Sequence, residues 1–491
     1  MDATFPLVRL ADVAAVVGAE VRGDPQTFVR DAAYDSRTVP PGSVFFCIPG
    51  ATADGHDFAS AAVASGAVAL VVEHPVDIGV PQIGVPQIVV PSVRRAIGPM
   101  SAVIFGDPGA GMTLVGITGT NGKTTTSYLL ESILSAAGRM PGVVGTTGVR
   151  IDGNPGPLAR TTPEAPDLQR LLARMRVAGV RAVALEVSSH ALAQHRVDGV
   201  VMDVALFTNL SQDHLDFHGS MQDYFGAKAL LFAPSHARHG VVNADDVWGR
   251  RLLEEPSIPT TTFALDAQAD LRARDIEVRE DGVGFAVDGL EVRSALRGRF
   301  NIENCLGALA VSRVLGIPGD DAVSAIASVP LVPGRMEPVE AGQGYAVVVD
   351  YAHTPDSILN VLRGARALAA GRVIVVFGCG GDRDRAKRPI MGRVAAEESD
   401  LAIVTSDNPR SEDPAAIIDQ VVAGMAAGAS YLVEPDRRSA IALGIAEARD
   451  GDVVVIAGKG HETYQEVGVD VLAFDDRVAA REAIAARSGA C

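Results

Sequence analysis

The chain has 491 residues, and at roughly 100 to 200 residues per domain this length predicts about three domains rather than one. Hydrophobic residues make up 47% of the chain and charged residues 21%, a composition that is typical of folded globular proteins and excludes general disorder. The formal net charge of −17 would repel a nucleic-acid backbone or an anionic membrane surface. We therefore expect neither as a partner, and we expect any anionic ligand to be held in a local positive pocket.

The start of the chain lacks a signal-peptide pattern, because Asp2 and further polar residues stand where a basic head and an unbroken apolar stretch would be needed. No run of about 18 apolar residues predicts a membrane-spanning helix. The cysteines Cys47, Cys305, Cys379 and Cys491 are widely scattered and form no CxxC pair, which argues against a zinc site or a disulfide framework. These features predict a cytoplasmic protein without membrane insertion.

The segment 1–105 is predicted to form a small α/β domain, with strands at 43–48 and 67–72 between turn residues. The segment 106–337 alternates strand-like and helical stretches, which is the βαβ signature of a parallel sheet. Its strands are predicted at 114–117, 182–187 and 204–208, and its helices at 124–137, 167–178 and 221–232.

Pro330, Pro333 and Gly334 interrupt the chain before a second alternation, which predicts a Rossmann-like, doubly wound domain over 338–491. Its strands are expected at 346–350, 372–377, 401–405 and 453–456. The predicted fold class is therefore α/β with three domains: a small N-terminal domain, a central P-loop domain with a parallel sheet, and the C-terminal Rossmann-like domain.

Lysine is nearly absent from the chain. Only Lys123, Lys228, Lys387 and Lys459 occur, and every other basic residue among the 43 is arginine. A lysine that persists in such a chain is a candidate for chemistry that needs a compact ammonium or a nitrogen that can lose its proton. For any single lysine, chance remains an equal explanation.

A phosphate-binding loop is predicted at the end of the first central strand. Residues 116–126 read Gly-Ile-Thr-Gly-Thr-Asn-Gly-Lys-Thr-Thr-Thr and lead from a strand into a helix, so that glycine N–H groups, a helix N-terminus and a lysine lie together. Ile117 stands where the strict GxxxxGK[ST] pattern requires its first glycine. The alternative is an ordinary glycine-rich turn. The predicted ATP-binding residues here are Gly119, Thr120, Asn121, Gly122, Lys123, Thr124 and Thr125.

The loop Gly-Thr-Asn-Gly-Lys-Thr resembles that of the Mur ligases and their folylpolyglutamate synthetase relatives, amide-forming enzymes that use ATP to activate a carboxylate. Further blocks follow in the order that this family shows, so the resemblance covers nearly the whole chain. They are Glu-Val-Ser-Ser-His at 186–190, Asn-Leu-Ser-Gln-Asp-His-Leu-Asp at 209–216 and Tyr-Phe-Gly-Ala-Lys at 224–228.

The resemblance implies a magnesium site made by Thr124, Glu186, His214 and Lys228, the lysine being carbamylated so that it offers a carboxylate. Divalent ions offset the negative charge that spreads over phosphoryl oxygens in the transition state, and carbamylation requires a primary amine. Lys123, Glu186, His214 and Lys228 are thus the predicted catalytic residues. Taken singly, Glu186 would be more simply explained as a helix cap and His214 as a structural histidine.

The nucleotide side of the site is implied by two further blocks. In Gly-Arg-Phe-Asn-Ile-Glu-Asn at 298–304, the resemblance assigns adenine recognition to Asn304, with Asn301 nearby; an amide can pair with the adenine edge. Arg335 is expected to bind the phosphates and Asp350 the ribose. Because both lie at a domain junction, we expect the third domain to close over ATP and exclude water. As linker residues, an arginine and an aspartate would be commonplace.

The first domain resembles the uridine-diphosphate site of the family member that forms the muramoyl tripeptide, and folylpolyglutamate synthetases lack this domain. Asp-Ser-Arg at 35–37 carries that resemblance. Arg160 departs from the pattern of some relatives, which leaves a direct contact there in doubt. The residues implied for the UDP-muramoyl dipeptide are Ser36, Thr161, Thr162, Ser188, Gln194 and Arg196.

The incoming amino acid is indicated by Asp-Asn-Pro-Arg at 407–410, which resembles the motif that selects meso-diaminopimelate over lysine. The guanidinium of Arg410 can bind the second carboxylate of diaminopimelate in a bidentate pair.

Further residues match other contacts to the amino acid in the family. They are Arg383, Gly458 and Glu462, and Glu462 would pair with a ligand ammonium. By itself, the charge cluster at 383–388 would be more simply explained as a solvated surface. Lys387 and Lys459 receive no role. The residues implied for diaminopimelate are Arg383, Asp407, Asn408, Pro409, Arg410, Gly458 and Glu462.

Together these motifs imply an ATP- and magnesium-dependent ligase that joins meso-2,6-diaminopimelate to the D-glutamate side chain of UDP-N-acetylmuramoyl-L-alanyl-D-glutamate through an acyl phosphate, in peptidoglycan precursor synthesis. We expect a monomer. One alternative is the same ligation with L-lysine or another amine. The other is a non-catalytic, ATP-dependent protein that only holds the muramoyl nucleotide.

Overall fold

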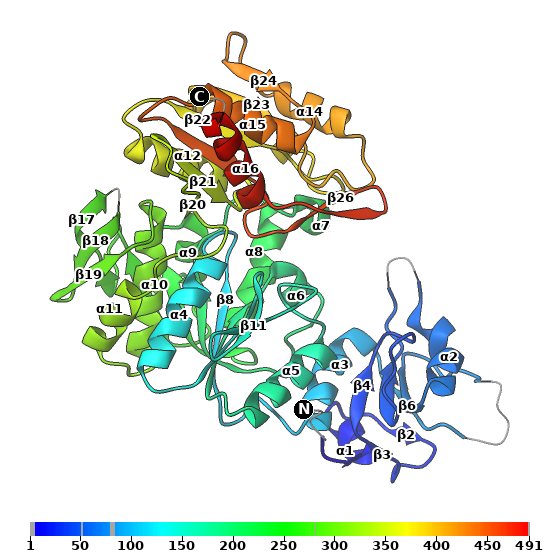
Figure 1. The fold of residues 1–491 in the computed structure, drawn as a ribbon. Helices are drawn as coiled ribbons and strands as arrows, with labels where there is room; N and C mark the ends of the chain where they lie inside the picture. Colours follow the sequence, from blue (N-terminus) through cyan, green and yellow to red (C-terminus); the bar gives the residue numbers. More distant parts are fainter. Residues whose placement is uncertain (1–4, 51–52, 79–83, 280, 490–491) are drawn as a thin grey trace.

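The computed structural model describes residues 5–50, 53–78, 84–279 and 281–489. Three α/β units follow one another along the chain, with the first and third attached to opposite ends of the central unit (Figure 1). Each unit has its own sheet, and the three sheets contain five, nine and six strands. The predicted α/β architecture with three domains is confirmed.

The first unit is a five-stranded sheet in the order β2-β7-β6-β5-β4. All four residues of β5 are buried, as expected for a short apolar strand between turns. Ser92 begins the longest helix of the unit by accepting a hydrogen bond from the Arg95 N–H group. The strands are β2 Val21–Arg22, β4 Asp31–Ala33, β5 Ser43–Phe46, β6 Ala67–Val72 and β7 Gln87–Val89; the helices are α1 Leu10–Ala15, α2 Ala59–Ala64 and α3 Val93–Ile104. A separate pair joins β1 Val8–Arg9 to β3 Phe28–Val29.

The central unit has a nine-stranded sheet in the order β11-β10-β9-β12-β8-β13-β14-β15-β16. Strands β9, β12, β8, β13, β14, β15 and β16 pair in parallel, while β10 and β11 add an antiparallel edge. The strands are β8 Thr113–Thr118, β9 Pro141–Gly145, β10 Gly148–Ile151, β11 Asn154–Gly156, β12 Ala182–Glu186, β13 Met202–Phe207, β14 Ala237–Asn243, β15 Thr260–Ala264 and β16 Leu271–Arg272.

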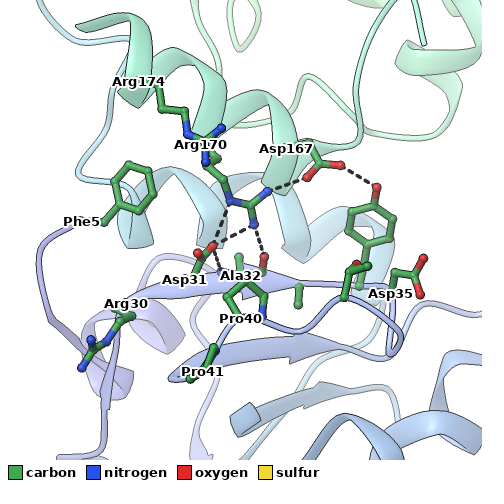
Figure 2. Close-up of a pocket in the computed structure, with 13 residues that line it drawn as sticks. Phe5, Arg30, Asp31, Ala32, Asp35, Pro40, Pro41, Asp167, Arg170 and Arg174 are labelled. Carbon is green, nitrogen blue, oxygen red and sulfur yellow. Dashed lines mark hydrogen bonds and ion pairs between the residues drawn. The ribbon is translucent and has the colours of Figure 1, made fainter. Parts of the chain in front are cut away.

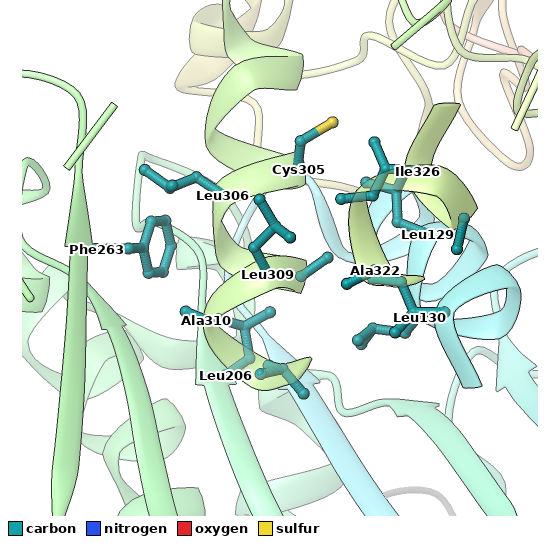
Figure 3. Close-up of a cluster of buried hydrophobic side chains, with 14 of the residues drawn as sticks. Leu129, Leu130, Leu206, Phe263, Cys305, Leu306, Leu309, Ala310, Ala322 and Ile326 are labelled. Atoms are coloured by element: carbon teal, nitrogen blue, oxygen red, sulfur yellow. The ribbon is translucent and has the colours of Figure 1, made fainter. Parts of the chain in front are cut away.

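Helices cover both faces of this sheet. On one face, Leu129, Leu206, Phe263 and Leu306 belong to a single buried cluster between the sheet and three helices (Figure 3); each such side chain contributes about 1.5–3 kcal/mol by leaving water. The helices are α4 Lys123–Ala136, α5 Ala165–Val177, α6 Ser189–Ala193, α7 Leu215–His218, α8 Met221–Ala229, α9 Val247–Leu252, α10 Phe300–Val314 and α11 Gly319–Ala327, with a 3-10 turn at Leu230–Phe232. A three-stranded antiparallel sheet, β17 Arg274–Arg279, β18 Gly282–Val287 and β19 Leu290–Ser294, lies beside α10 and α11.

The third unit is a six-stranded sheet in the order β20-β21-β25-β22-β23-β24, parallel except for β20. Its central strands are fully buried valine- and isoleucine-rich runs, as expected for a sheet covered on both faces. The strands are β20 Glu337–Pro338, β21 Ala346–Asp350, β22 Val373–Phe377, β23 Leu401–Val404, β24 Tyr431–Val433 and β25 Val453–Ala457, followed by the hairpin β26 Tyr464–Val467 and β27 Asp470–Ala473. The helices are α12 Pro355–Leu368, α13 Lys387–Glu398, α14 Pro414–Val422, α15 Arg437–Glu447 and α16 Asp476–Gly489.

Every strand and helix predicted from the sequence is present within a few residues of its expected bounds. The sequence analysis did not predict strand β9, the antiparallel strands β10, β11 and β17 to β19, or the hairpin β26 and β27, because these segments contain glycine or alternate charged residues and lack a long apolar run. Cys47, Cys305 and Cys379 are buried and unbonded, while Cys491 lies outside the described residues. In the described part, no helix has the length and apolar character needed to cross a membrane.

Candidate active site

The phosphate loop runs from the end of β8 into α4. Gly119 and Gly122 have φ angles of 149° and 86°, which favour glycine. A Cβ atom would overlap the Thr208 hydroxyl at Gly119 and the Asn304 amide at Gly122. The backbone can therefore follow this path only with glycine at both places. Lys123, the first residue of α4, donates from Nζ to the carbonyl oxygens of Gly119 at 2.9 Å and Thr120 at 2.8 Å.

Lys228 reaches the same loop from α8. Its Nζ donates to the Gly119 carbonyl oxygen at 2.8 Å, so two lysine side chains share one acceptor. Its side chain is buried, and the ammonium lies 4.7 Å from the centre of the Tyr224 ring. Burial, and then the neighbouring charge of Lys123, lower the pKa of Lys228 well below its ordinary value. This environment favours the neutral amine, the form that is nucleophilic.

Glu186 ends β12 with a fully buried side chain. Its carboxylate accepts hydrogen bonds from the Thr124 hydroxyl at 3.1 Å, and from the Thr146 hydroxyl at 2.8 Å and N–H group at 3.1 Å. Arg335 of the third unit donates from Nη2 to the Thr124 hydroxyl at 3.1 Å. The structure therefore brings Thr124, Glu186 and Arg335 together at the start of α4.

His214 lies in the loop before α7 with a φ angle of 55°. Its Nε2 is 3.2 Å from Asp213 Oδ2, and burial lowers the pKa of His214 to about 3, which leaves the ring neutral and able to bind a metal ion. Among the described residues, no group of three or more His, Cys, Asp and Glu side chains is placed to hold a metal. Of the four expected magnesium ligands, two, Glu186 and His214, are of these types.

The amides expected to recognise adenine lie on the first turns of α10. Asn304 donates to Asn301 Oδ1 at 2.8 Å, and Asn301 donates to the Arg297 carbonyl oxygen at 2.6 Å. Asn304 lines a narrow pocket with Phe263 and Glu303. Glu303 was not among the site residues predicted from the sequence. Burial, and then nearby carboxylates, raise the pKa of Glu303 to about 7. The carboxylates of Asp245 and Asp246, which follow β14, lie near Glu303 only in the folded chain, so the sequence alone did not indicate this residue.

Asp350, the residue expected to bind the ribose, is buried and is not among the residues that line this pocket. Its oxygens accept hydrogen bonds from the N–H groups of Met336 at 2.7 Å and Ala352 at 2.8 Å. Met336 has a φ angle of 45°, in the connection between the central and third units. In this arrangement Asp350 fixes the connection, while Arg335 beside it extends to the phosphate loop.

The residues predicted for the muramoyl portion form one network at the carboxyl ends of β9 and β12. Thr162 donates to the Glu186 carbonyl oxygen at 2.8 Å and accepts from the Ser188 N–H group at 3.0 Å. Arg196 donates to the Thr162 carbonyl oxygen at 3.2 Å and to Gln194 Oε1 at 2.6 Å. The Thr161 hydroxyl lies 3.2 Å from that of Thr146.

Glu164 is a further residue of this network that was missed. Its carboxylate pairs with Arg196 at 3.0 Å, Arg94 at 2.8 Å and Arg160 at 2.7 Å. Arg160, whose role the sequence left in doubt, is thus paired within the protein. No sequence pattern marked Glu164, since its partners come from separate segments.

Ser36 belongs to the first unit and is not part of this network. A cavity of about 630 Å³ lies beside its loop, between strand β4 and helix α5, and is lined by Tyr34, Asp35 and Arg170 among others (Figure 2). Arg170 spans the two units by pairing with Asp31 at 2.8 Å, and the Tyr34 hydroxyl donates to Asp167 at 2.6 Å. Ser36 itself does not line the cavity.

The residues predicted for the amino acid meet at the carboxyl ends of β22, β23 and β25. Asn408 donates from Nδ2 to Glu462 Oε2 at 3.1 Å. Arg410, with a φ angle of 53°, donates to the Gly381 carbonyl oxygen at 2.9 Å and pairs with Glu466 at 2.8 Å. Glu466, in the hairpin that the sequence did not reveal, was also missed.

The remaining predicted members surround this group. Gly458 has a φ angle of 121°, and a Cβ atom there would overlap the Asp407 carboxylate. Arg383 is exposed and donates to the Asp382 carbonyl oxygen at 2.8 Å. Pro409 continues the loop from Asn408 to Arg410. Of the predicted residues, Arg383 alone is directed to solvent within the part of the site that the structure describes.

A glycine-rich loop between a strand and a helix, with two lysines bonded to it and a buried carboxylate beside it, is typical of enzymes that transfer a phosphoryl group. The chain belongs to the Mur ligase family. The Mur ligase middle domain matches residues 117–312, the Mur ligase glutamate ligase domain matches 334–460, and the Mur ligase family catalytic domain matches 31–103. It is therefore an ATP-dependent, amide-forming ligase.

Two similar proteins, from Geobacillus thermodenitrificans and Streptomyces avermitilis, both bear the name UDP-N-acetylmuramoyl-L-alanyl-D-glutamate--2,6-diaminopimelate ligase. The first is 46% identical over 92% of this chain and 94% of its own length, and the second is 46% identical over 98% and 97%. A solved structure of a ligase with that name is 34% identical, with a TM-score of 0.69 over 98% of this chain and 100% of that one. The MurF ligase of Acinetobacter baumannii, 19% identical with a TM-score of 0.69 over 93% of this chain and 96% of its own, shares the fold.

Proposed function

We propose that this chain is the ligase that joins meso-2,6-diaminopimelate to the D-glutamate side-chain carboxylate of UDP-N-acetylmuramoyl-L-alanyl-D-glutamate, with ATP hydrolysed to ADP and phosphate. The observation that carries the proposal is the similarity, over nearly the full length, to relatives that bear this name. The position of Arg410 supports the choice of amino acid, since its guanidinium lies among the residues predicted to bind the amine substrate.

The reaction begins when the γ-phosphoryl group of ATP passes to the D-glutamate carboxylate. We assign the nucleotide to the pocket beside Asn304 and its phosphates to the loop before α4, where Lys123 and Arg335 supply positive charge. These cations stabilise the charge on the transferring group. The muramoyl peptide would be held by Thr162 and Arg196, close to Glu186 and the loop.

Magnesium, which we propose as the cofactor, would supply further positive charge for the phosphoryl oxygens when bound. Thr124, Glu186 and His214 offer the oxygen and nitrogen ligands for it. We propose that Lys228 is carbamylated and adds a carboxylate. Its burial, its lowered pKa and its neighbour Lys123 support this, because carbon dioxide reacts with an uncharged amine.

The amine of diaminopimelate then attacks the acyl phosphate, and phosphate leaves from the tetrahedral intermediate. Glu462 would pair with an ammonium of the amino acid and Arg410 with its distant carboxylate. A lysine substrate lacks the distant carboxylate and would lose its charge-assisted hydrogen bond to Arg410, which remains paired with Glu466. Such a bond contributes about 1.5–3 kcal/mol, which corresponds to a preference of roughly tenfold or more. We propose that the enzyme acts as a monomer in the cytoplasm.

The test is phosphate release from ATP with magnesium and the UDP-muramoyl dipeptide, in the presence of meso-diaminopimelate, L-lysine or no amino acid. Release with diaminopimelate alone supports the proposal. Release with L-lysine instead would contradict the role of Arg410. Absence of release with either amine would favour a protein that binds the muramoyl nucleotide without ligating it.

A further inference from the structure

Lys459 is one of the two lysines for which the sequence suggested no role, and its side chain is fully buried. It follows β25 between Gly458 and Gly460, whose φ angles of 121° and 54° lie in the left-handed region. A Cβ atom on Gly460 would lie 2.7 Å from the Cβ atom of Tyr351. The two glycines therefore allow a tight turn that places Lys459 beneath the amino-acid site.

The ammonium of Lys459 links two residues that we assign to amino-acid binding. Its Nζ donates to Asn408 Oδ1 at 2.8 Å and to Glu462 Oε2 at 3.1 Å. Asn408 donates from Nδ2 to that same Glu462 oxygen at 3.1 Å. Each of the three groups is thus bonded to the other two, although Asn408 and Glu462 come from loops after different strands.

Lys459 also balances the charge of the site. Asp407 Oδ1 lies 3.9 Å from Nζ, so one cation faces two carboxylates. The nearby buried guanidinium of Arg437 is neutralised by Asp476 at 2.7 Å, and the ionised cluster therefore keeps one net negative charge for a ligand ammonium. Burial, and also Asp407, raise the pKa of Glu462, while Lys459 acts in the opposite direction. Without Lys459, two carboxylates would be close together in a buried site, which favours protonation of one of them.

The contacts of Lys459 suit an ammonium group. One nitrogen donates to two oxygen atoms from different loops inside a space with no exposed surface. An ammonium is a compact donor, whereas a guanidinium is a larger planar fork with a different donor geometry. Lysine at 459 therefore matches this pair of acceptors in a chain that uses arginine for nearly all its other basic residues.

We propose that Lys459 is a positioning residue of the amino-acid site, whose ammonium holds the Glu462 carboxylate and the Asn408 amide in the orientation that receives the ammonium group of the incoming amino acid. This inference rests on the proposed function, since it takes the loops at 407–410 and 458–462 as the amine site. Lys459 acts through Glu462 and contacts none of the phosphate-loop residues, so its removal affects binding of the amine and not of ATP.

The test compares the wild-type enzyme with Lys459→Met in the phosphate-release assay. The KM for meso-diaminopimelate is expected to rise at least about tenfold, as for loss of a hydrogen bond to a charged group, while the KM for ATP changes by less than about twofold. The KM for the amine in the variant should also fall as the pH rises, because Glu462 then ionises without its counter-charge. Arg366→Met, which removes a cation of the same unit from an exposed pair with Asp400, should not produce this pH dependence.

A second comparison separates positioning from general destabilisation. Because Lys459 acts through Glu462 and Asn408, the rise in the KM for the amine in Lys459→Met/Glu462→Gln should be clearly smaller than the product of the two single-variant rises. An unchanged KM in Lys459→Met, additive effects in the double variant, or parallel changes in every KM and in the melting temperature would each overturn the inference. If Lys459→Met does not fold, Lys459→Gln, which keeps a donor, replaces it.

The same experiment distinguishes failure of the inference from failure of the proposed function. A wild-type enzyme that uses L-lysine but not meso-diaminopimelate would contradict the proposed function. The ratio of KM values between variant and wild type, measured with the amine that is accepted, would still decide the role of Lys459. A ratio near one would reject that role.

Discussion

Lys387 of the third unit and Asp213 of the central unit form an ion pair across the domain junction, with 3.2 Å between Nζ and Oδ1 and both side chains about 5% exposed. The other oxygen of Asp213 lies 3.2 Å from His214 Nε2. Although burial alone would raise it, Lys387, His214 and His353 hold the pKa of Asp213 below its usual range. The docking of the third unit thereby fixes a residue adjacent to a proposed magnesium ligand.

Replacement of Lys387 by methionine is expected to loosen the third unit, because Asp213 would remain buried without its cation. Breaking a buried pair in this way costs about 3–5 kcal/mol. We expect a larger radius of gyration in small-angle X-ray scattering and a lower kcat. Arg366→Met is a matched control, since Arg366 and Asp400 form a pair whose side chains are 45% and 40% exposed. An unchanged scattering curve for Lys387→Met would contradict the prediction.

Stability is expected to fall as the pH is lowered from about 6.5 to about 4. Burial lowers the pKa of His353 and of His461 to about 4, whereas the unfolded imidazoles bind protons near pH 6.5. In this window the unfolded chain binds more protons, so each histidine adds a slope of up to about 1.4 kcal/mol per pH unit to the free energy of unfolding. Urea unfolding at several pH values measures it, and His461→Asn should reduce the slope. An unfolding free energy independent of pH here would refute the prediction.

Arg410→Lys is expected to raise the KM for meso-diaminopimelate by roughly tenfold or more, since a single ammonium cannot reproduce the bidentate contact with the distant carboxylate. The KM for ATP should be unaffected. Kinetics of phosphate release measure both constants. Arg363→Lys, at an exposed pair with Glu398, is the matched control. Equal KM values for Arg410→Lys and the wild type would remove Arg410 from the amine site.

Carbamylation of Lys228 is expected to give a carbonyl signal in ¹³C nuclear magnetic resonance after the protein is equilibrated with ¹³C-bicarbonate. Lys228→Arg should lose the signal, because a guanidinium remains protonated and does not add carbon dioxide. Lys387→Arg should retain it, since Lys387 is already paired with Asp213. A signal that survives Lys228→Arg would assign the carbamate to another amine.

The fold could be predicted where short apolar runs end at turn residues, as at 182–187 and 453–456. Such runs are typical of strands that are buried on both faces of a parallel sheet. The phosphate loop could be predicted for a related reason. Its glycines and lysine are adjacent in the chain, so local sequence defines the geometry. The antiparallel edge of the central sheet carried no such pattern, since β10 and β11 are only four and three residues long and both contain glycine.

The candidate site was predictable only in part, because several of its residues act through partners far along the chain. Glu164 forms ion pairs with Arg94, Arg160 and Arg196, two of which are distant in the sequence. Glu466 pairs with Arg410 from a hairpin whose sequence does not predict strands. Asp350 is predicted to bind the ribose, and in the structure each of its carboxylate oxygens accepts a hydrogen bond from a backbone N–H group. Such contacts form only in the folded chain, and no motif or regular spacing in the sequence indicates them.

The scarcity of lysine has a practical consequence when it is combined with where the lysines lie. Lys228, Lys387 and Lys459 are buried, and Lys123 is partly covered, so an amine-reactive reagent meets almost no accessible side-chain amine on the folded chain. Opening of the junction between the central and third units would expose the nitrogen of Lys387, and unfolding of a unit would expose the lysine nitrogens buried within it. Labelling of the four lysines, followed by mass spectrometry, would therefore report which part of the molecule opens, one position at a time.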